Sequence, residues 1–76
     1  MRVEIEPVYQ AVGARVRMIR EALGRDQASL AKAVGLTRTS IVNLEAGRQR
    51  VQLHQLSKLA AALGTTEKHL LRGIWV

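Results

Sequence analysis

The sequence predicts an all-α protein, a compact bundle of five short helices. Apolar residues recur at intervals of three and four along most of the chain, which is the period of an amphipathic helix. Small polar residues that cap helix starts and glycines that end helices divide this pattern into five segments. These boundary residues are Pro7, Asp26, Thr37 and Thr66 at helix starts, and Gly24, Gly35, Gly47, Gly64 and Gly73 at helix ends.

The first helix is expected to begin at Pro7, because proline costs nothing in a first turn, where its missing N–H has no partner. Its inward face carries apolar residues at helical spacing, Val12, Val16, Ile19 and Leu23. Gly13 inside this helix costs roughly 1 kcal/mol relative to alanine. We therefore expect another helix to approach the backbone closely at Gly13.

Two further helices follow with a tight turn between them. Asp26 and Thr37 are good N-caps for them, and Gly35 supplies the positive φ that a tight turn needs. Their inward residues are expected to be Leu30, Ala31 and Val34 in the second helix, and Ile41 and Leu44 in the third.

The last two helices are separated by Gly64. The fourth has one apolar face, made of Leu53, Leu56, Leu59, Ala60 and Leu63. Thr66 caps a short fifth helix that carries Leu70 and Leu71.

The two ends of the chain differ in character from the helices. Val3 and Ile5 alternate with polar residues, which is the period of a strand. Residues 74–76 are apolar and β-prone. These extensions either pack on the bundle or pair as short strands, within one chain or across a dimer.

Size and charge limit the classes of function. At 76 residues there is room for one domain with one small core, so we expect residues 1–76 to form a single domain. The net charge is +6, and residues 15–50 carry eight basic against three acidic residues. A concentrated basic excess favours a polyanion as partner.

Several other kinds of site are not expected. The chain has no cysteine, which excludes disulfides and thiolate metal sites. His54 and His69 are isolated from acidic clusters, and no catalytic constellation is present, so we expect neither cofactor nor enzyme activity. No apolar run approaches the roughly 20 residues of a membrane span, and the start lacks a signal-peptide layout. We therefore expect a cytoplasmic protein.

Residues 27–46 form the layout of a helix-turn-helix motif. The sequence here resembles the Cro and phage-repressor class of helix-turn-helix domains, also called XRE-type, over about residues 12–72. The matching pieces are Gln27, Leu30-Ala31, Gly35, residues 37–40, Ile41, the Leu44-Glu45-x-Gly47 step, and the LxxLAxALG pattern that ends at Gly64. The family usually has proline near position 51, where this chain has Val51.

This resemblance implies a five-helix domain of the lambda-repressor type, whose third helix, about residues 38–46, enters the major groove of double-stranded DNA. If Ile41 and Leu44 face the core, Arg38, Thr39 and Asn43 lie on the exposed side. Arginine can bond guanine O6 and N7, and asparagine can bond adenine N6 and N7. We expect these three residues to contact base edges.

Other residues are expected to contact the DNA backbone. In similar domains the residue at the Gln27 position holds a phosphate and braces the recognition helix. The remaining backbone candidates are Thr37, Ser40, Arg48, Arg50 and Arg25. Thr37 can equally be a plain helix cap, and Arg48 and Arg50 can equally belong to a solvated loop.

Glu45 is awkward for a helix that faces DNA. In similar domains this glutamate pairs with an arginine on the first helix, and Arg20 stands at the matching position. The resemblance thus implies a structural Arg20–Glu45 salt bridge.

The favoured function is a sequence-specific transcriptional regulator, a repressor that binds a near-palindromic operator as a homodimer. The apolar residues expected at the dimer interface are Leu70, Leu71, Ile74, Trp75 and Val76. One alternative is an antitoxin or restriction–modification controller that also binds a protein partner. Another is a basic adaptor for RNA or protein, although one Tyr, one Trp and no Phe leave few stacking platforms for single strands.

Overall fold

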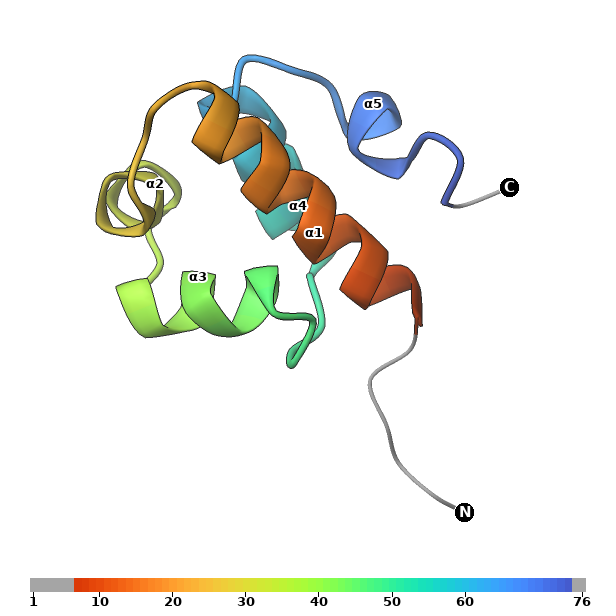
Figure 1. Cartoon of the computed structure of the whole chain (residues 1–76), viewed down its shortest axis with the longest axis horizontal. Helices are drawn as coiled ribbons and strands as arrows, with labels where there is room; N and C mark the ends of the chain where they lie inside the picture. The colour runs from red at the N-terminus through yellow and green to blue at the C-terminus, as the bar shows by residue number, and fades with distance from the viewer. Residues whose placement is uncertain (1–6, 75–76) are drawn as a thin grey trace.

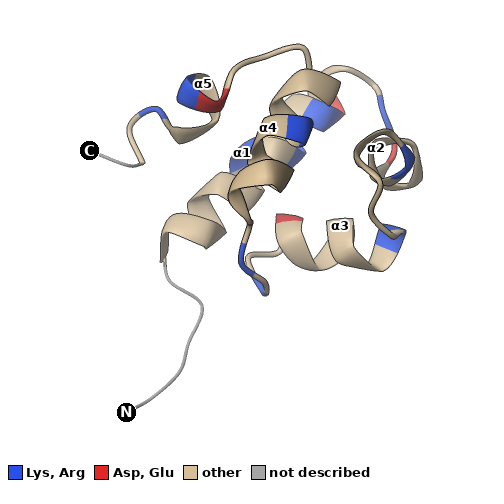
Figure 2. Ribbon diagram, turned by 180° about the vertical axis from the view of Figure 1, so that it is seen from behind, with Lys and Arg blue, Asp and Glu red and all other residues tan. Residues whose placement is uncertain are grey.

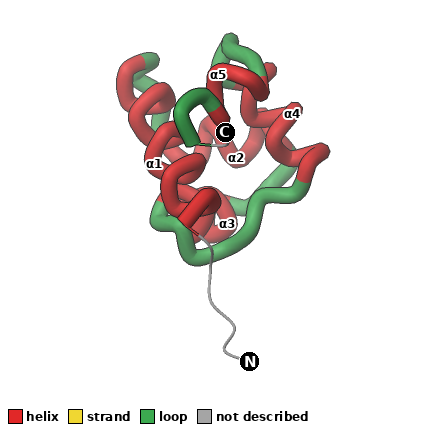
Figure 3. The backbone as a smooth tube through the Cα atoms, turned by 90° about the vertical axis from the view of Figure 1, so that its right-hand side faces the viewer, coloured by secondary structure: helices red, strands yellow, loops and turns green. Residues whose placement is uncertain are grey.

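The computed structural model of the chain describes residues 7–74. These residues form five helices and no strand, which confirms the predicted fold class (Figures 1 and 3). The helices are α1 (Pro7–Ala22), α2 (Gln27–Val34), α3 (Arg38–Glu45), α4 (Leu53–Ala62) and α5 (Glu67–Leu71). The strand pairing considered for the two ends concerns residues 2–6 and 74–76. Of these only Ile74 is described, and it lies in a turn in which its backbone N–H donates to the Leu71 carbonyl at 3.0 Å. The others lie outside the described residues.

The helix starts follow the predicted capping residues. The Asp26 carboxylate accepts a hydrogen bond from the Ser29 backbone N–H at 2.7 Å. The hydroxyl oxygens of Thr37 and Thr66 accept in the same way from backbone N–H groups three residues later, at 3.0 and 3.1 Å. Each cap satisfies one N–H that has no partner within its helix.

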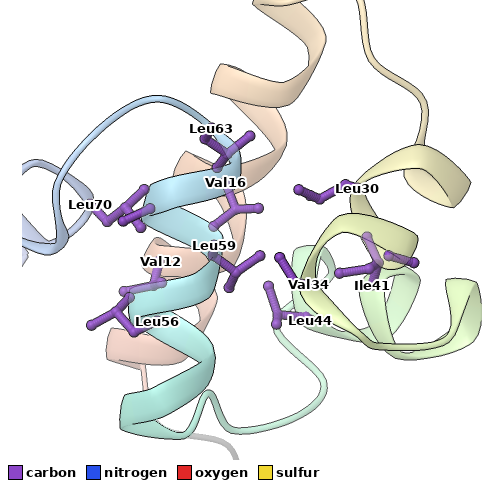
Figure 4. Packing of buried hydrophobic residues seen from close by; sticks show 12 residues of the cluster. Val12, Val16, Leu30, Val34, Ile41, Leu44, Leu56, Leu59, Leu63 and Leu70 are labelled. Atoms are coloured by element: carbon purple, nitrogen blue, oxygen red, sulfur yellow. The ribbon is translucent and has the colours of Figure 1, made fainter.

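One apolar core holds the helices together. Helix α3 packs against α1 and α2, α4 packs against α2, and α5 packs against α1 and α4. Figure 4 shows side chains from all five helices converging on this core. Its fully buried larger members are Val16, Leu30, Ile41, Leu44, Leu59 and Leu70.

Two residues predicted on inward faces are exposed instead. Leu23 lies in the turn just beyond the end of α1 and is 52% exposed. Leu53 begins α4 and is 85% exposed, because the covered face of that helix starts one turn later at Leu56. Helical spacing was right for the other apolar positions but wrong for these two terminal ones.

Gly13 is the point of closest approach between α1 and α3. A Cβ atom at this position would overlap the backbone carbonyl oxygen of Leu44. The close helix contact expected from this mid-helix glycine is therefore confirmed.

Short helix α5 is tied to the bundle by polar contacts as well as by Leu70. The Arg15 guanidinium donates to the backbone carbonyls of His69 and Arg72, at 2.8 and 3.1 Å. The Ser57 hydroxyl on α4 donates to the Glu67 carboxylate at 2.7 Å, which lowers the pKa of Glu67 below its ordinary value. These contacts fix α5 against both α1 and α4.

Candidate nucleic-acid interface

Helices α2 and α3 are joined by a turn of three residues. Gly35 adopts a left-handed conformation with φ of 72°, and Thr37 caps α3. On α3, Ile41 and Leu44 point into the core. The opposite side of α3 therefore forms an outer edge of the molecule, next to the start of α2 (Figure 1).

The three residues expected to contact bases lie on this outer side of α3. Arg38 and Thr39 are exposed and Asn43 is half-buried. Thr39 and Asn43 are four residues apart, so they share one helix face. Among the described residues none of the three side chains makes a hydrogen bond or an ion pair. Their polar groups are free for an external partner.

The Arg20–Glu45 salt bridge is present and joins α1 to the end of α3. The Arg20 Nε and Nη2 atoms donate to the two Glu45 carboxylate oxygens at 2.6 and 3.0 Å, and both side chains are buried. Arg20 Nη1 also donates to the Arg25 carbonyl at 2.7 Å. The hydrogen bond to Glu45 raises the pKa of the Arg20 guanidinium above its ordinary value, so Arg20 stays charged.

Gln27 completes this network from the start of α2. Its Nε2 atom donates to Glu45 Oε1 at 3.1 Å, so one carboxylate ties together α1, α2 and α3. The expected bracing of the recognition helix by Gln27 is therefore confirmed. The second amide hydrogen and the amide oxygen of Gln27 are left for another partner.

The remaining backbone candidates divide into two groups. Thr37 and Ser40 hydrogen-bond to each other as a helix cap. Arg48 and Arg50 are exposed in the loop between α3 and α4. Figure 2 shows basic residues at the start of α3 and in this loop, so positive charge flanks the outer side of α3 at both ends.

Arg25 is engaged within the protein. Its Nη1 atom donates to the Ala62 carbonyl at the end of α4 at 2.6 Å, and its Nη2 atom donates to Ser29 Oγ at 3.2 Å. Arg25 thus joins the start of α2 to the end of α4. The sequence predicts only a phosphate contact for Arg25 and gives no sign of these internal bonds.

One residue expected at the dimer interface is placed differently by the structure. Leu70 is fully buried in the core of its own chain, so it offers no surface to a partner. Leu71 and Ile74 are only partly buried against that core. Trp75 and Val76 lie outside the described residues.

Two further residues border the site and were missed by the sequence interpretation. Arg17 on α1 and Val42 on α3 help to line a hollow of about 350 Å³ together with Gln27, Ala46 and Arg48. Arg17 precedes Arg20 by three residues, and Val42 lies four residues after Arg38. Helical spacing could therefore have placed both of them beside residues already assigned to the site.

Other kinds of site find little support in the part of the chain that the structure describes. Residues 7–74 contain no group of three potential metal ligands among His, Asp and Glu. Within the same range, no helix combines the length and the apolar character needed to cross a bilayer.

Comparison with known proteins agrees with this geometry. The family model for helix-turn-helix domains matches residues 16–70. The clp gene regulator ClgR from Corynebacterium glutamicum is 28% identical, with a TM-score of 0.84 over 88% of this chain and 71% of that one. The restriction-modification controller protein C.AhdI from Aeromonas hydrophila is 35% identical, with a TM-score of 0.78 over 82% of this chain and 94% of that one.

A third similar structure is that of the P22 c2 repressor in complex with a synthetic operator. It is 33% identical, with a TM-score of 0.77 over 84% of this chain and 97% of that one. These matches include phage repressors and other regulators, and they cover the helix-turn-helix and the core beneath it. The chain belongs to the helix-turn-helix family of the Cro/C1, or XRE, type and is a DNA-binding transcriptional regulator.

Proposed function

We propose that this protein is a repressor that acts in the cytoplasm and binds a near-palindromic operator as a homodimer. One observation carries the proposal: the side chains of Arg38, Thr39 and Asn43 on α3 have no hydrogen-bond partner within residues 7–74, while Glu45 at the end of α3 is fixed by Arg20 and Gln27. A rigid helix with free polar groups is suited to reading base edges in the major groove.

In the proposed complex, Arg38 bonds a guanine and Asn43 bonds an adenine. Val42, half-buried on the same helix, supplies an apolar surface for a thymine methyl group. The chain then represses by occupying its operator, which requires no catalytic step.

In the same complex, residues that border α3 hold the phosphates on either side of the DNA major groove. Two of these contacts are the free amide hydrogen of Gln27 and the exposed guanidinium of Arg48. Their positions around one hollow support this role. Arg17 lies on the same hollow, where it pairs with Glu21 at 3.3 Å in an exposed salt bridge that a phosphate can replace. Thr37, Ser40 and Arg50 complete the proposed set of backbone contacts.

Selection of bound sequences from a random pool of duplex DNA tests this function. We expect a half-site repeated in inverted orientation, with centres about 34 Å apart, or one helical turn. Recovery of no preferred sequence would contradict sequence-specific regulation. Recovery of a single unrepeated site would contradict the symmetric dimer.

Variants at Arg38 and Arg48 then separate base reading from backbone binding. Arg38→Ala should weaken the free energy of binding to the selected site by about 1–3 kcal/mol. It should also relax the base preference at one base pair of each half-site. Arg48→Ala should lower the affinity for all DNA sequences by a similar factor. If Arg38→Ala also weakened all sequences equally, the assignment of Arg38 to a base edge would be wrong.

A restriction–modification controller is the second candidate. The similarity to C.AhdI favours it, because this chain matches 94% of the length of that protein at 35% identity. Locating the selected half-site in the genome distinguishes a controller from a general repressor. A controller should have its site upstream of restriction and methyltransferase genes. A site elsewhere would leave the general repressor as the better description.

A further inference from the structure

Leu53 is the most exposed large apolar residue among those the structure describes. Its side chain is 85% exposed, compared with 57% for Met18 and 52% for Leu23. It projects from the first turn of α4, where none of residues 7–74 covers it. A leucine this accessible gains from burial against an apolar partner.

An apolar groove of about 380 Å³ lies directly beside Leu53. It runs between the start of α1, the start of α4 and α5, and Leu53 forms part of its wall. The other lining residues are Val8, Tyr9, Val12, Val51, Leu56 and Leu71. The projecting side chain and the hollow therefore belong to one patch of the surface.

This patch carries no charged side chain, although the chain as a whole has a net charge of +6. Two such chains repel each other through most of their surface. They can meet with least repulsion at a neutral face. None of the residues assigned to DNA lines the groove, so a partner seated there leaves the outer side of α3 free.

We propose that the occupant of the groove is a second copy of this chain, with Leu53 of each copy inserted into the groove of the other. An interface with two-fold symmetry uses the same patch on both subunits, so that patch must contain both the projection and the cavity that receives it. This inference rests on the homodimer of the proposed function and assigns its contact face. Leu71 continues the patch towards Ile74, which is partly buried in the turn that follows α5.

Two leucine substitutions test the assignment in the full-length chain. Leu53→Asp places a carboxylate at the groove, and Leu23→Asp makes the same change at an exposed leucine beside the end of α1, away from it. An acidic residue is compatible with the first turn of α4, which has none, so Leu53→Asp should still fold. Circular dichroism of both variants checks this.

Sedimentation over a concentration series measures self-association. We expect the natural chain and Leu23→Asp to dimerise alike, and Leu53→Asp to raise the dimer dissociation constant at least tenfold. Equal association of the two variants would overturn the assignment, as would a natural chain that stays monomeric at every concentration.

Binding to DNA separates this inference from the proposed function. All three proteins should bind a single half-site with equal affinity, and Leu53→Asp should lose cooperative binding to the full operator. If the natural chain binds no duplex selectively, the proposed function fails. If Leu53→Asp keeps full cooperativity, only the contact face is wrong.

The contact itself can be observed because Tyr9 is the only tyrosine in the chain. In a sample that mixes isotope-labelled and unlabelled copies, nuclear Overhauser effects should join Leu53 methyl groups of one copy to the Tyr9 ring of the other. Effects at the Tyr9 ring that arise only within one copy, from its own terminal residues, would contradict the proposal.

Discussion

Glu45 stands where local electrostatics favour a basic residue. It ends α3, at the negative pole of a helix dipole, and in the proposed complex that helix faces a polyanion. Two donors offset this cost, because Arg20 binds both carboxylate oxygens and Gln27 binds one of them. The acidic group is thereby directed into the protein, where it is buried.

Removing Glu45 should be severely destabilising. Glu45→Ala leaves the Arg20 guanidinium buried without its counter-ion, which typically costs about 3 kcal/mol or more. Lys32→Ala, at an exposed position of α2, is the matched control and should change stability little. Thermal unfolding of the two variants compares them, and equal melting temperatures would refute the structural role of the pair.

At the scale of single residues, the sequence predicts those contacts that a residue makes with its near neighbours along the chain. Asp26 and Thr37 cap helices because the backbone N–H groups that donate to them lie three residues away, so local pattern suffices. The Arg20–Glu45 pair spans 25 residues and was predictable only through resemblance to a family. The hydrogen bond from Arg25 to the Ala62 carbonyl of α4 had no local signal in the sequence.

The contact between α1 and α3 sets where the recognition helix lies. At Gly13 the two backbones approach so closely that any side chain would collide with the Leu44 carbonyl. A second contact is the ion pair between Arg20, about two turns further along α1, and Glu45, the residue after Leu44. Together the two contacts fix α3 relative to the rest of the bundle.

Gly13→Ala should therefore destabilise the protein, although alanine is the better helix former by roughly 1 kcal/mol. Forcing a methyl group into a filled contact costs about 1–3 kcal/mol, and α3 must shift to relieve it. Ala14→Gly, at an exposed position of the same helix, is the control and should lose only the propensity difference. Chemical denaturation measures both, and a Gly13→Ala protein as stable as the natural chain would contradict the close contact.

At the scale of elements, periodicity predicts which way a side chain points. It does not show whether a neighbouring helix extends far enough to cover that side chain. Leu56 and Leu53 share a face of α4, yet only Leu56 has another helix opposite it. In the same way Leu70 was assigned to a partner, because the sequence does not show that α1 and α4 leave room for it in the core.

The whole molecule separates its charge from its apolar patch. Exposed basic residues flank α3, while the uncharged groove opens between α1, α4 and α5. Figures 1 and 2 show α3 and α5 on different sides of the bundle. In the proposed assembly, DNA and the second copy therefore occupy separate faces of the molecule.

The salt dependence of operator affinity should report how many phosphates the assembly contacts. Each neutralised phosphate contributes about 0.9 to the slope of log affinity against log salt, so Arg17→Ala should reduce the slope of a dimer by about 2. Lys68→Ala, on α5, removes the same charge away from α3 and should leave the slope unchanged. Equal slopes for the natural chain and Arg17→Ala would remove Arg17 from the interface.

The side chains of Arg38, Thr39 and Asn43 make no hydrogen bond or ion pair within residues 7–74, and none of them belongs to the buried core. Their replacement should therefore change the preferred operator and leave the melting temperature nearly as it was. New regulators with different target sites should be obtainable from a library that varies these three codons alone. The same independence would let duplicated copies of such a gene diverge in target without passing through an unstable intermediate.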